Sequence, residues 1–302
     1  MKFLTFKGAN GPQLGMLRDG NSIINLSAAW AELPGHEGGV PTHVGELIEL
    51  GEAGIKAVQS IRDNDPSRFV IDLDDVQFLA PIPVPRKNIF CVGRNYREHI
   101  IEGNLARGRD PNDFPKAVEF FTKAPTTVTG HRQPVKRHAD VTDFLDYEVE
   151  LGVVIGKRGV NIRTGEAYDY VFGYTVVNDI TARDRQLAHG QWFKGKSLDT
   201  TCPIGPYVVH RSSIADPHTL RISLDVNGEP RQDSNTSSLL FTVPEVIAEL
   251  SAGMTLEPGD VIATGTPSGV GLGLKPQKKL NVGDIVRARI EGIGELENRI
   301  VE

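Results

Sequence analysis

Short apolar segments separated by turns begin the chain. Three of them carry strand-like patterns: residues 2–7, 14–17 and 22–26. The turn Asp19-Gly20-Asn21 joins the last two as a hairpin. Residues 43–62 instead show apolar residues at helical spacing, interrupted around Gly51 and Gly54. These patterns predict a small α+β unit at the start of the chain.

A proline-rich segment separates this unit from the rest of the chain. Pro81, Pro83 and Pro85 make the surrounding segment extended and stiff. We place the boundary there, which gives a small N-terminal domain over residues 1–80 and a larger domain over residues 81–302.

The larger domain is predicted to be rich in strands. Apolar runs predict strands over the following ranges: 88–92, 147–155, 171–177, 220–226, 261–264 and 285–290. Asn227-Gly228 is a hairpin signal after the fourth strand. Helical spacing occurs at 95–103, 181–189 and 243–252. We therefore expect a mainly β protein with some α-helix, whose sheet is closed or rolled rather than doubly wound.

Composition and charge exclude several classes of protein. The 302 residues include 32 glycines and 19 prolines, which fits many turns between short strands. The net charge of −6 and the absence of a basic block argue against nucleic-acid binding. Two cysteines are too few for a disulfide scaffold. No apolar run approaches the ~18 residues that span a bilayer, and the N-terminus does not resemble a signal peptide. We expect a cytoplasmic protein that binds no membrane.

Three carboxylates are the first candidates for chemistry. Glu148 and Glu150 alternate with apolar residues, so a strand would place both on one face. Neighbouring carboxylates repel each other, which is tolerable on a solvated face or around a cation. Asp179 follows a predicted strand and is either a helix N-cap or a third oxygen ligand. A site made only of carboxylates favours Mg²⁺ or Mn²⁺ over Zn²⁺.

Two predicted helices carry further candidates. Arg183 and Gln186 follow Asp179 at a spacing that would place all three on one helical face. His99 and Glu102 are three residues apart on another predicted helix, where a glutamate can orient a histidine and raise its basicity for activating water. The alternative for the second pair is an ordinary surface interaction.

Several motifs in a fixed order over residues 87–300 resemble the fumarylacetoacetate hydrolase superfamily. They are Gly93-Arg94-Asn95-Tyr96 with His99 and Glu102, Phe121-Thr122-Lys123, Asp146-Tyr147-Glu148-Val149-Glu150-Leu151, Asn178-Asp179-Ile180-Thr181-Ala182-Arg183-Asp184 with Gln186, Lys196-Ser197-Leu198-Asp199, and the glycine-rich segment 258–271. One such motif alone would be weak, whereas their order along the chain makes the resemblance specific.

The resemblance implies a mixed β-sandwich roll that assembles as a homodimer and binds a divalent metal, Mg²⁺ or Mn²⁺. It assigns the metal ligands to Glu148, Glu150 and Asp179. It makes His99 and Glu102 the water-activating pair on a lid segment. Other matched positions stabilise negative charge or contact substrate: Lys123, Lys196, Arg94, Tyr96, Arg183, Gln186 and Thr266.

Members of this superfamily act on small 2-keto or 1,3-dicarbonyl acids. We expect hydrolysis of an acylpyruvate-type acid such as fumarylpyruvate, in aromatic or sugar-acid breakdown, because decarboxylation alone needs no water-activating pair. The alternatives are an isomerase or decarboxylase of 2-hydroxydienedioates, for example 2-hydroxyhepta-2,4-diene-1,7-dioate, an oxaloacetate decarboxylase, and a non-catalytic binder of metal or keto acid.

Overall fold

The computed structural model describes residues 1–33, 39–106 and 108–302. Its first elements form a small antiparallel sheet with helices against it: β1 (Lys2–Gly8), β2 (Gly11–Leu17), β3 (Ser22–Asn25), α1 (Leu26–Trp30), α2 (Val44–Glu49), α3 (Gly51–Asp63), β4 (Val70–Asp72) and β5 (Phe78–Leu79). The three strands predicted before residue 27 are confirmed. Leu50 lies between α2 and α3, and Gly51, the first residue of α3, has a φ of 56°, a left-handed conformation that favours glycine.

The rest of the chain is mainly strand. Its strands and α-helices are β6 (Ile89–Gly93), α4 (Arg97–Ala106), β7 (Glu119–Lys123), β8 (Val128–Thr129), β9 (Val135–Lys136), β10 (Leu145–Asp146), β11 (Val149–Ile155), β12 (Val171–Asn178), β13 (Thr181–Ala182), α5 (Arg183–Ala188), α6 (Phe193–Lys196), β14 (Cys202–His210), β15 (Arg221–Val226), β16 (Glu229–Asn235), α7 (Val243–Ser251), β17 (Val261–Ala263), β18 (Ile285–Ile290) and β19 (Gly294–Val301). Short 3-10 helices lie at Ser67–Phe69, Leu73–Asp75, Pro125–Thr127, Thr164–Tyr170, Arg211–Ser213 and Thr236–Ser238.

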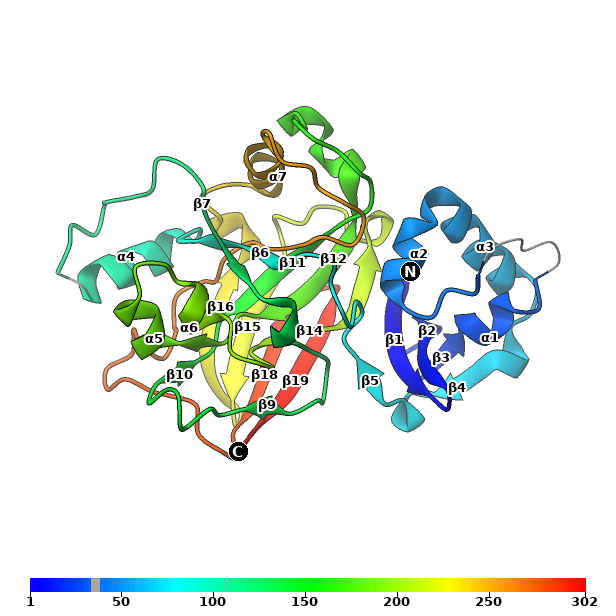
Figure 1. Ribbon diagram of the computed structural model, residues 1–302, viewed down its shortest axis with the longest axis horizontal. Coiled ribbons are helices and arrows are strands. Elements are labelled where there is room, and N and C mark those ends of the chain that lie inside the picture. The colour runs from blue at the N-terminus through cyan, green and yellow to red at the C-terminus, as the bar shows by residue number, and fades with distance from the viewer. Residues whose placement is uncertain (34–38, 107) are drawn as a thin grey trace.

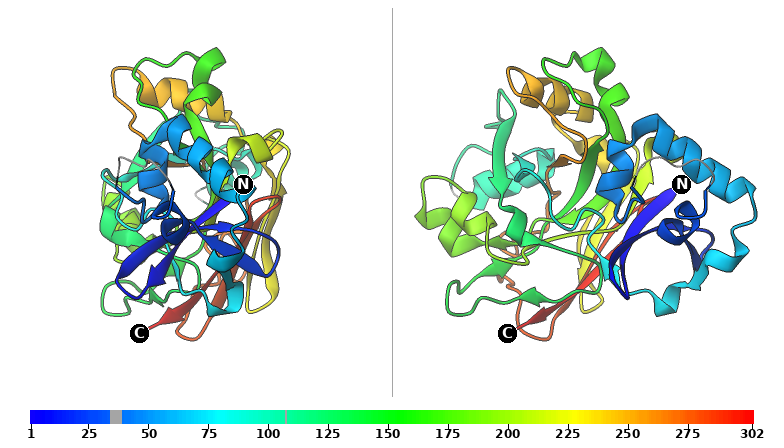
Figure 2. Two further views of the ribbon diagram at one scale, coloured as in Figure 1. Left: turned by 90° about the vertical axis from the view of Figure 1, so that its right-hand side faces the viewer. Right: turned by 45° about the vertical axis from the view of Figure 1, so that its right-hand side comes forward.

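Two large sheets organise these strands. The first has the order β4-β3-β2-β1-β14-β12-β11-β17-β6-β7, so β1 pairs with β14 and continues the N-terminal sheet into the larger part of the molecule. The second has the order β16-β15-β18-β19-β9. Figures 1 and 2 show the N-terminal elements, in blue, at one end of the molecule, while α4, α5 and α6 lie towards the other. The mainly β class with mixed sheets is confirmed.

Side chains alternate between the two faces of β11, so apolar residues face the core and the two glutamates face the opposite side. Val149, Leu151 and Val153 belong to one apolar cluster with Leu224 and Ala288 of the second sheet. The intervening positions before and within β11 carry the two glutamates, which therefore face away from that cluster. Every residue of β11 and of its neighbour β12 is buried, because both faces of this part of the sheet are covered.

Several elements differ from the sequence-based expectations. Strands β7, β14 and β19 were not predicted. In β14, Pro203, Gly205 and Pro206 are residues that normally argue against a strand interior. The helix predicted over 181–189 is shorter, since Thr181–Ala182 forms strand β13 and only Arg183–Ala188 is helical. Within the described part of the chain, no helix has the length and apolar character needed to cross a membrane.

Candidate active site

The three predicted metal ligands come from the adjacent ends of β11 and β12. Val149 is paired with Asn178, so the residues that flank this pair, Glu148 and Asp179, lie side by side. The Asp179 amide donates to the Glu148 carbonyl at 2.8 Å. One carboxylate oxygen from each of Glu148, Glu150 and Asp179 lies within 4.8 Å of the others, and all three side chains are buried. The alternative of a solvated acidic face is therefore wrong.

Two buried cations bind this carboxylate cluster directly. The Lys196 ammonium, at the end of α6, lies 2.7 Å from Glu148 Oε2 and 2.6 Å from Asp179 Oδ2. The Arg183 guanidinium, at the start of α5, lies 2.7 Å from Glu148 Oε1. Both carboxylate oxygens of Glu148 thus have a cationic partner.

The three carboxylates differ in how well their charge is balanced. Burial alone would raise the pKa of Glu148, but Lys196 and Arg183 hold it down at about 2. Burial raises the pKa of Glu150 well above its usual range, and the negative charges of Asp179 and Glu148 raise it further. The charge of Glu150 is therefore the least compensated in the cluster.

This donor set fits a divalent cation. Three buried oxygen ligands that repel one another are stabilised by a hard cation placed among them. The Oε2 atom of Glu150 accepts a hydrogen bond from the Gly265 amide at 2.7 Å. The structure thus contains a buried acidic cluster that could bind a divalent metal, and it consists of the three predicted ligands.

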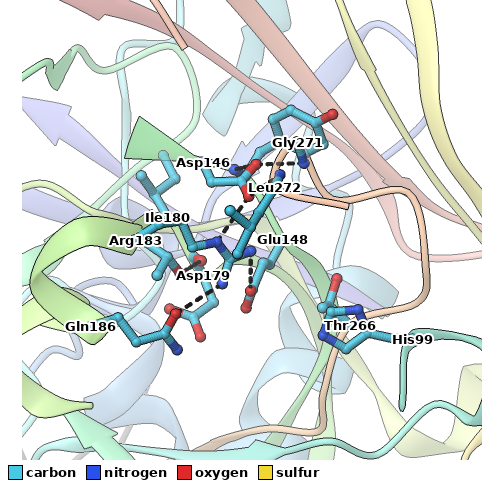
Figure 3. A network of polar contacts seen from close by, with 12 residues as sticks. His99, Asp146, Glu148, Asp179, Ile180, Arg183, Gln186, Thr266, Gly271 and Leu272 are labelled. Carbon is cyan, nitrogen blue, oxygen red and sulfur yellow. Dashed lines mark hydrogen bonds and ion pairs between the residues drawn. The ribbon is translucent and has the colours of Figure 1, made fainter. Parts of the chain in front are cut away.

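The predicted His99–Glu102 pair lies on α4 and faces the same space as the carboxylates. Glu102 Oε2 lies 3.2 Å from His99 Nδ1, and Glu102 Oε1 accepts the Gly269 amide at 3.2 Å. Figure 3 shows Glu148 between His99 and Thr266 on one side and Arg183 on the other. The pair is therefore part of a cavity wall, not an ordinary surface interaction.

A cavity of about 320 Å³ joins these groups. The predicted site residues on its wall are Arg94, His99, Glu102, Glu148, Glu150, Arg183, Gln186, Lys196 and Thr266. Apolar side chains that include Phe121, Leu187 and Trp192 line it as well. One cavity thus combines an acidic metal-type site, a histidine–glutamate pair and several nitrogen donors.

Three predicted residues do not line this cavity. Asp179 and Lys123 lie behind its wall, where the Lys123 ammonium is 2.7 Å from Asp179 Oδ1 and donates to the Ile180 carbonyl at 2.9 Å. Tyr96, expected to contact substrate, is instead fully buried among core residues, and its hydroxyl has no hydrogen-bond partner among the described residues. Burial raises the pKa of the Tyr96 hydroxyl.

The expected helical face of Asp179, Arg183 and Gln186 is also wrong. Asp179 precedes β13 and lies outside α5, so it is neither on that helix nor its N-cap. Arg183 and Gln186 do interact on α5, with Arg183 Nη1 donating to Gln186 Oε1 at 3.2 Å. Glu148 is the carboxylate that Arg183 contacts in the cluster.

The sequence reasoning missed two partners of the site residues. Glu119 of β7 accepts from Arg94 Nε at 2.8 Å. Asp146 accepts from Arg183 Nε at 2.9 Å. Asp146 begins the motif that contains Glu148 and Glu150, but nothing in the local pattern distinguishes it from a solvated residue.

A sequence model described as "Fumarylacetoacetate (FAA) hydrolase C-terminal" matches residues 88–301. The chain belongs to the fumarylacetoacetate hydrolase family. The resemblance inferred from the ordered motifs is therefore confirmed, and the protein is an enzyme of this superfamily.

Two curated relatives are similar over essentially the whole chain. The oxaloacetate tautomerase YisK of Bacillus subtilis (strain 168) is 49% identical, over 99% of this chain and 100% of its own length. The mitochondrial oxaloacetate tautomerase fahd2 of Xenopus laevis is 37% identical, over 100% of this chain and 90% of its own length. Both names describe a tautomerase rather than a hydrolase.

Solved structures with the same fold include hydrolases. A fumarylacetoacetate hydrolase from psychrophilic Exiguobacterium antarcticum is 37% identical with a TM-score of 0.80, over 100% of this chain and 99% of that one. A maleylpyruvate hydrolase from Sphingobium sp. SYK-6 is 30% identical with a TM-score of 0.77, over the same shares of the two chains. The family therefore accommodates both reaction types on this fold.

Proposed function

We propose that this protein is a tautomerase of small 2-keto dicarboxylic acids of the oxaloacetate type. The observation that carries this proposal is the His99–Glu102 pair on the wall of the cavity that Glu148 and Glu150 of the carboxylate cluster also line. The two curated relatives named as oxaloacetate tautomerases support the same reading, because they align with nearly the whole chain. The reaction moves one proton between C3 and the C2 oxygen and breaks no carbon–carbon bond.

The metal in this proposal is Mg²⁺ or Mn²⁺, held by Glu148, Glu150 and Asp179. When bound, such an ion acts as a Lewis acid that stabilises the negative charge of an enolate. The three protein carboxylates are its ligands. Lys196 helps to keep Glu148 ionised and holds both Glu148 and Asp179 in place through its ion pairs.

The chain's own residues supply binding and proton transfer. In the enolising direction His99 takes the proton from C3 and passes it to the C2 oxygen, and in the reverse direction it takes the proton from the C2 hydroxyl and returns it to C3. Glu102 at Nδ1 orients the ring for this transfer. Arg183 and Gln186 present nitrogen donors on the cavity wall for the substrate's carboxylates. The apolar side chains around them limit access of water to the enol.

Hydrolysis of an acylpyruvate is the second candidate. It was the expectation drawn from the histidine–glutamate pair, but the same pair serves to shuttle a proton, so it does not separate the two reactions. The observation that keeps hydrolysis in view is the whole-chain match to the maleylpyruvate hydrolase structure.

The test monitors the ultraviolet absorbance of enol-oxaloacetate as it converts to the keto form, with Mg²⁺, with Mn²⁺ and with EDTA. We expect metal-dependent acceleration with no release of pyruvate or CO₂. His99→Gln should lower the rate at least ~100-fold, the typical contribution of a general base, whereas His189→Gln at an exposed position should not. Faster release of pyruvate from fumarylpyruvate than tautomerisation of oxaloacetate would replace the proposal with the hydrolase.

A further inference from the structure

Asp146 is fully buried, and each of its two carboxylate oxygens accepts two hydrogen bonds. Its Oδ1 accepts the backbone amides of Tyr147 at 2.9 Å and Gly271 at 2.8 Å. Its Oδ2 accepts Arg183 Nε at 2.9 Å and the Leu272 amide at 3.0 Å. Figure 3 shows this network above Glu148 and Asp179. An aspartate with four such partners is held in one orientation and in turn fixes the groups that bind it.

The first group that Asp146 fixes is Arg183. Because Asp146 holds Nε, the other two guanidinium nitrogens are directed at Glu148 and Gln186. Arg183 thus reaches a proposed metal ligand in an orientation that Asp146 determines.

The second group is the glycine-rich loop after β17. A Cβ on Gly271 would lie 2.7 Å from Asp146 Oδ1 and 1.8 Å from the Lys278 carbonyl oxygen, so this part of the loop packs closely on Asp146. Two residues on, a Cβ on Gly273 would lie 2.3 Å from Glu102 Oε1. The same loop donates the Gly269 amide to that oxygen. The loop that Asp146 binds therefore also packs against Glu102 and holds its carboxylate in position.

We propose that Asp146 is a positioning residue that joins the two halves of the active site. Through Arg183 it orients Glu148 on the metal side. Through the loop at 269–273 it positions Glu102, and hence His99, which transfers the proton. Asp146 itself does not line the cavity. Only the turnover part of this proposal rests on the proposed tautomerase function.

Asp146→Asn tests both branches at once. The substitution keeps the size of the side chain but replaces one acceptor oxygen with a donor that faces N–H groups. We expect kcat to fall about 10- to 100-fold, the usual effect of losing a partner of a metal ligand or catalytic base, with a much smaller change in KM. Calorimetric titration should show weaker Mn²⁺ binding, and amide hydrogen exchange without metal or substrate should be faster in α4 and at 269–273.

Gly273→Ala separates the two branches. The added methyl displaces Glu102 while Asp146, Arg183 and the carboxylate cluster remain intact. We expect lower kcat and faster exchange in α4, with Mn²⁺ affinity equal to that of the wild type. Gly165→Ala is the matched control, because a Cβ at Gly165 meets no atom of the described residues within 4 Å. All three readouts should stay unchanged.

Defined results overturn the proposal. Wild-type kcat in Asp146→Asn, or exchange that rises equally in α4 and in the β11–β12 core, would reduce Asp146 to a general structural role. If hydrogen exchange in α4 is unchanged in both variants, the loop at 269–273 does not position Glu102 and that part of the proposal is wrong. Hydrogen exchange and Mn²⁺ titration need no substrate, so they decide the positioning role even if the wild type fails to tautomerise oxaloacetate.

Discussion

At the scale of single residues, the buried charges of the site depend on one another. Lys196 is almost fully buried and its ammonium contacts both Glu148 and Asp179. Removing one partner of a buried ion pair leaves an uncompensated charge and typically costs about 3–5 kcal/mol. We therefore expect Lys196→Met to lower the free energy of unfolding by about 3 kcal/mol in EDTA.

The same variant should respond more strongly to metal. Without the ammonium, the cluster is more negative, so Mn²⁺ should raise the Tm of Lys196→Met by more than it raises that of the wild type. Lys194→Met, at an exposed position on the same helix, is the control and should match the wild type in both conditions. A smaller Mn²⁺ shift in Lys196→Met would show that the lysine does not compete with a cation for these carboxylates.

The residues that the sequence located correctly are those whose pattern is local. The alternation at Glu148 and Glu150 predicts a shared face, and Asp179 comes directly after a recognisable strand. Tyr96 and Asp146 could not be placed this way. The loop that binds Asp146 is 125 residues away, and Tyr96 is buried in an apolar cluster whose members include distant residues of the second sheet.

At the scale of elements, the Trp192 side chain, from the turn before α6, packs so closely on β6 that position 93 has no room for a side chain. A Cβ on Gly93 would lie 2.4 Å from Trp192 Cζ3, and Trp192 packs edge-on against Phe121 of β7 at 5.3 Å. All three residues line the cavity. The apolar part of the cavity wall therefore depends on the Trp192 indole lying directly against β6 at Gly93, a contact that the sequence pattern alone does not reveal.

Gly93→Ala should displace Trp192 and reshape this wall. We expect a loss of about 1–3 kcal/mol in the free energy of unfolding, typical of overpacking, and an increased KM with Mn²⁺ affinity unchanged. The chain has two tryptophans, so Trp192 fluorescence is compared in a background where Trp30 is replaced by Phe. Gly190→Ala has open space around its Cβ and is the control. Unchanged Trp192 emission in Gly93→Ala would mean that the close approach is not maintained in solution.

At the scale of the whole molecule, the N-terminal unit and the rest share one sheet and one core. Phe3 and Leu47 belong to the same apolar cluster as Val154 and Val208, and β1 pairs directly with β14. The proline segment at 79–87 was the basis for placing a domain boundary. The helices and strands before it were largely predicted. The β1–β14 pairing was not, because it joins residues about two hundred positions apart and β14 does not look like a strand.

His131 lies where the two parts meet and should make the fold sensitive to acid. Its ring is edge-on to Phe78 of β5 at 4.9 Å, and its Nδ1 accepts the Glu297 amide at 3.0 Å, which requires the unprotonated nitrogen. Burial, reinforced by Arg132 and opposed by Glu297, lowers the pKa of His131 from 6.5 to about 4. The unfolded chain therefore binds a proton at higher pH than the folded chain does.

The sign of the pH dependence is set by this difference. The neutral ring contributes stability that is fully present above pH 6.5 and is lost as the pH falls towards 4. We expect the wild type to lose up to about 1.4 kcal/mol per pH unit across that window relative to His131→Gln. Glutamine keeps an acceptor for the Glu297 amide and does not titrate. Urea unfolding at several pH values measures the difference, with His189→Gln at an exposed position as the control. Parallel stability curves for the wild type and His131→Gln would show that protonation of this ring is not coupled to folding.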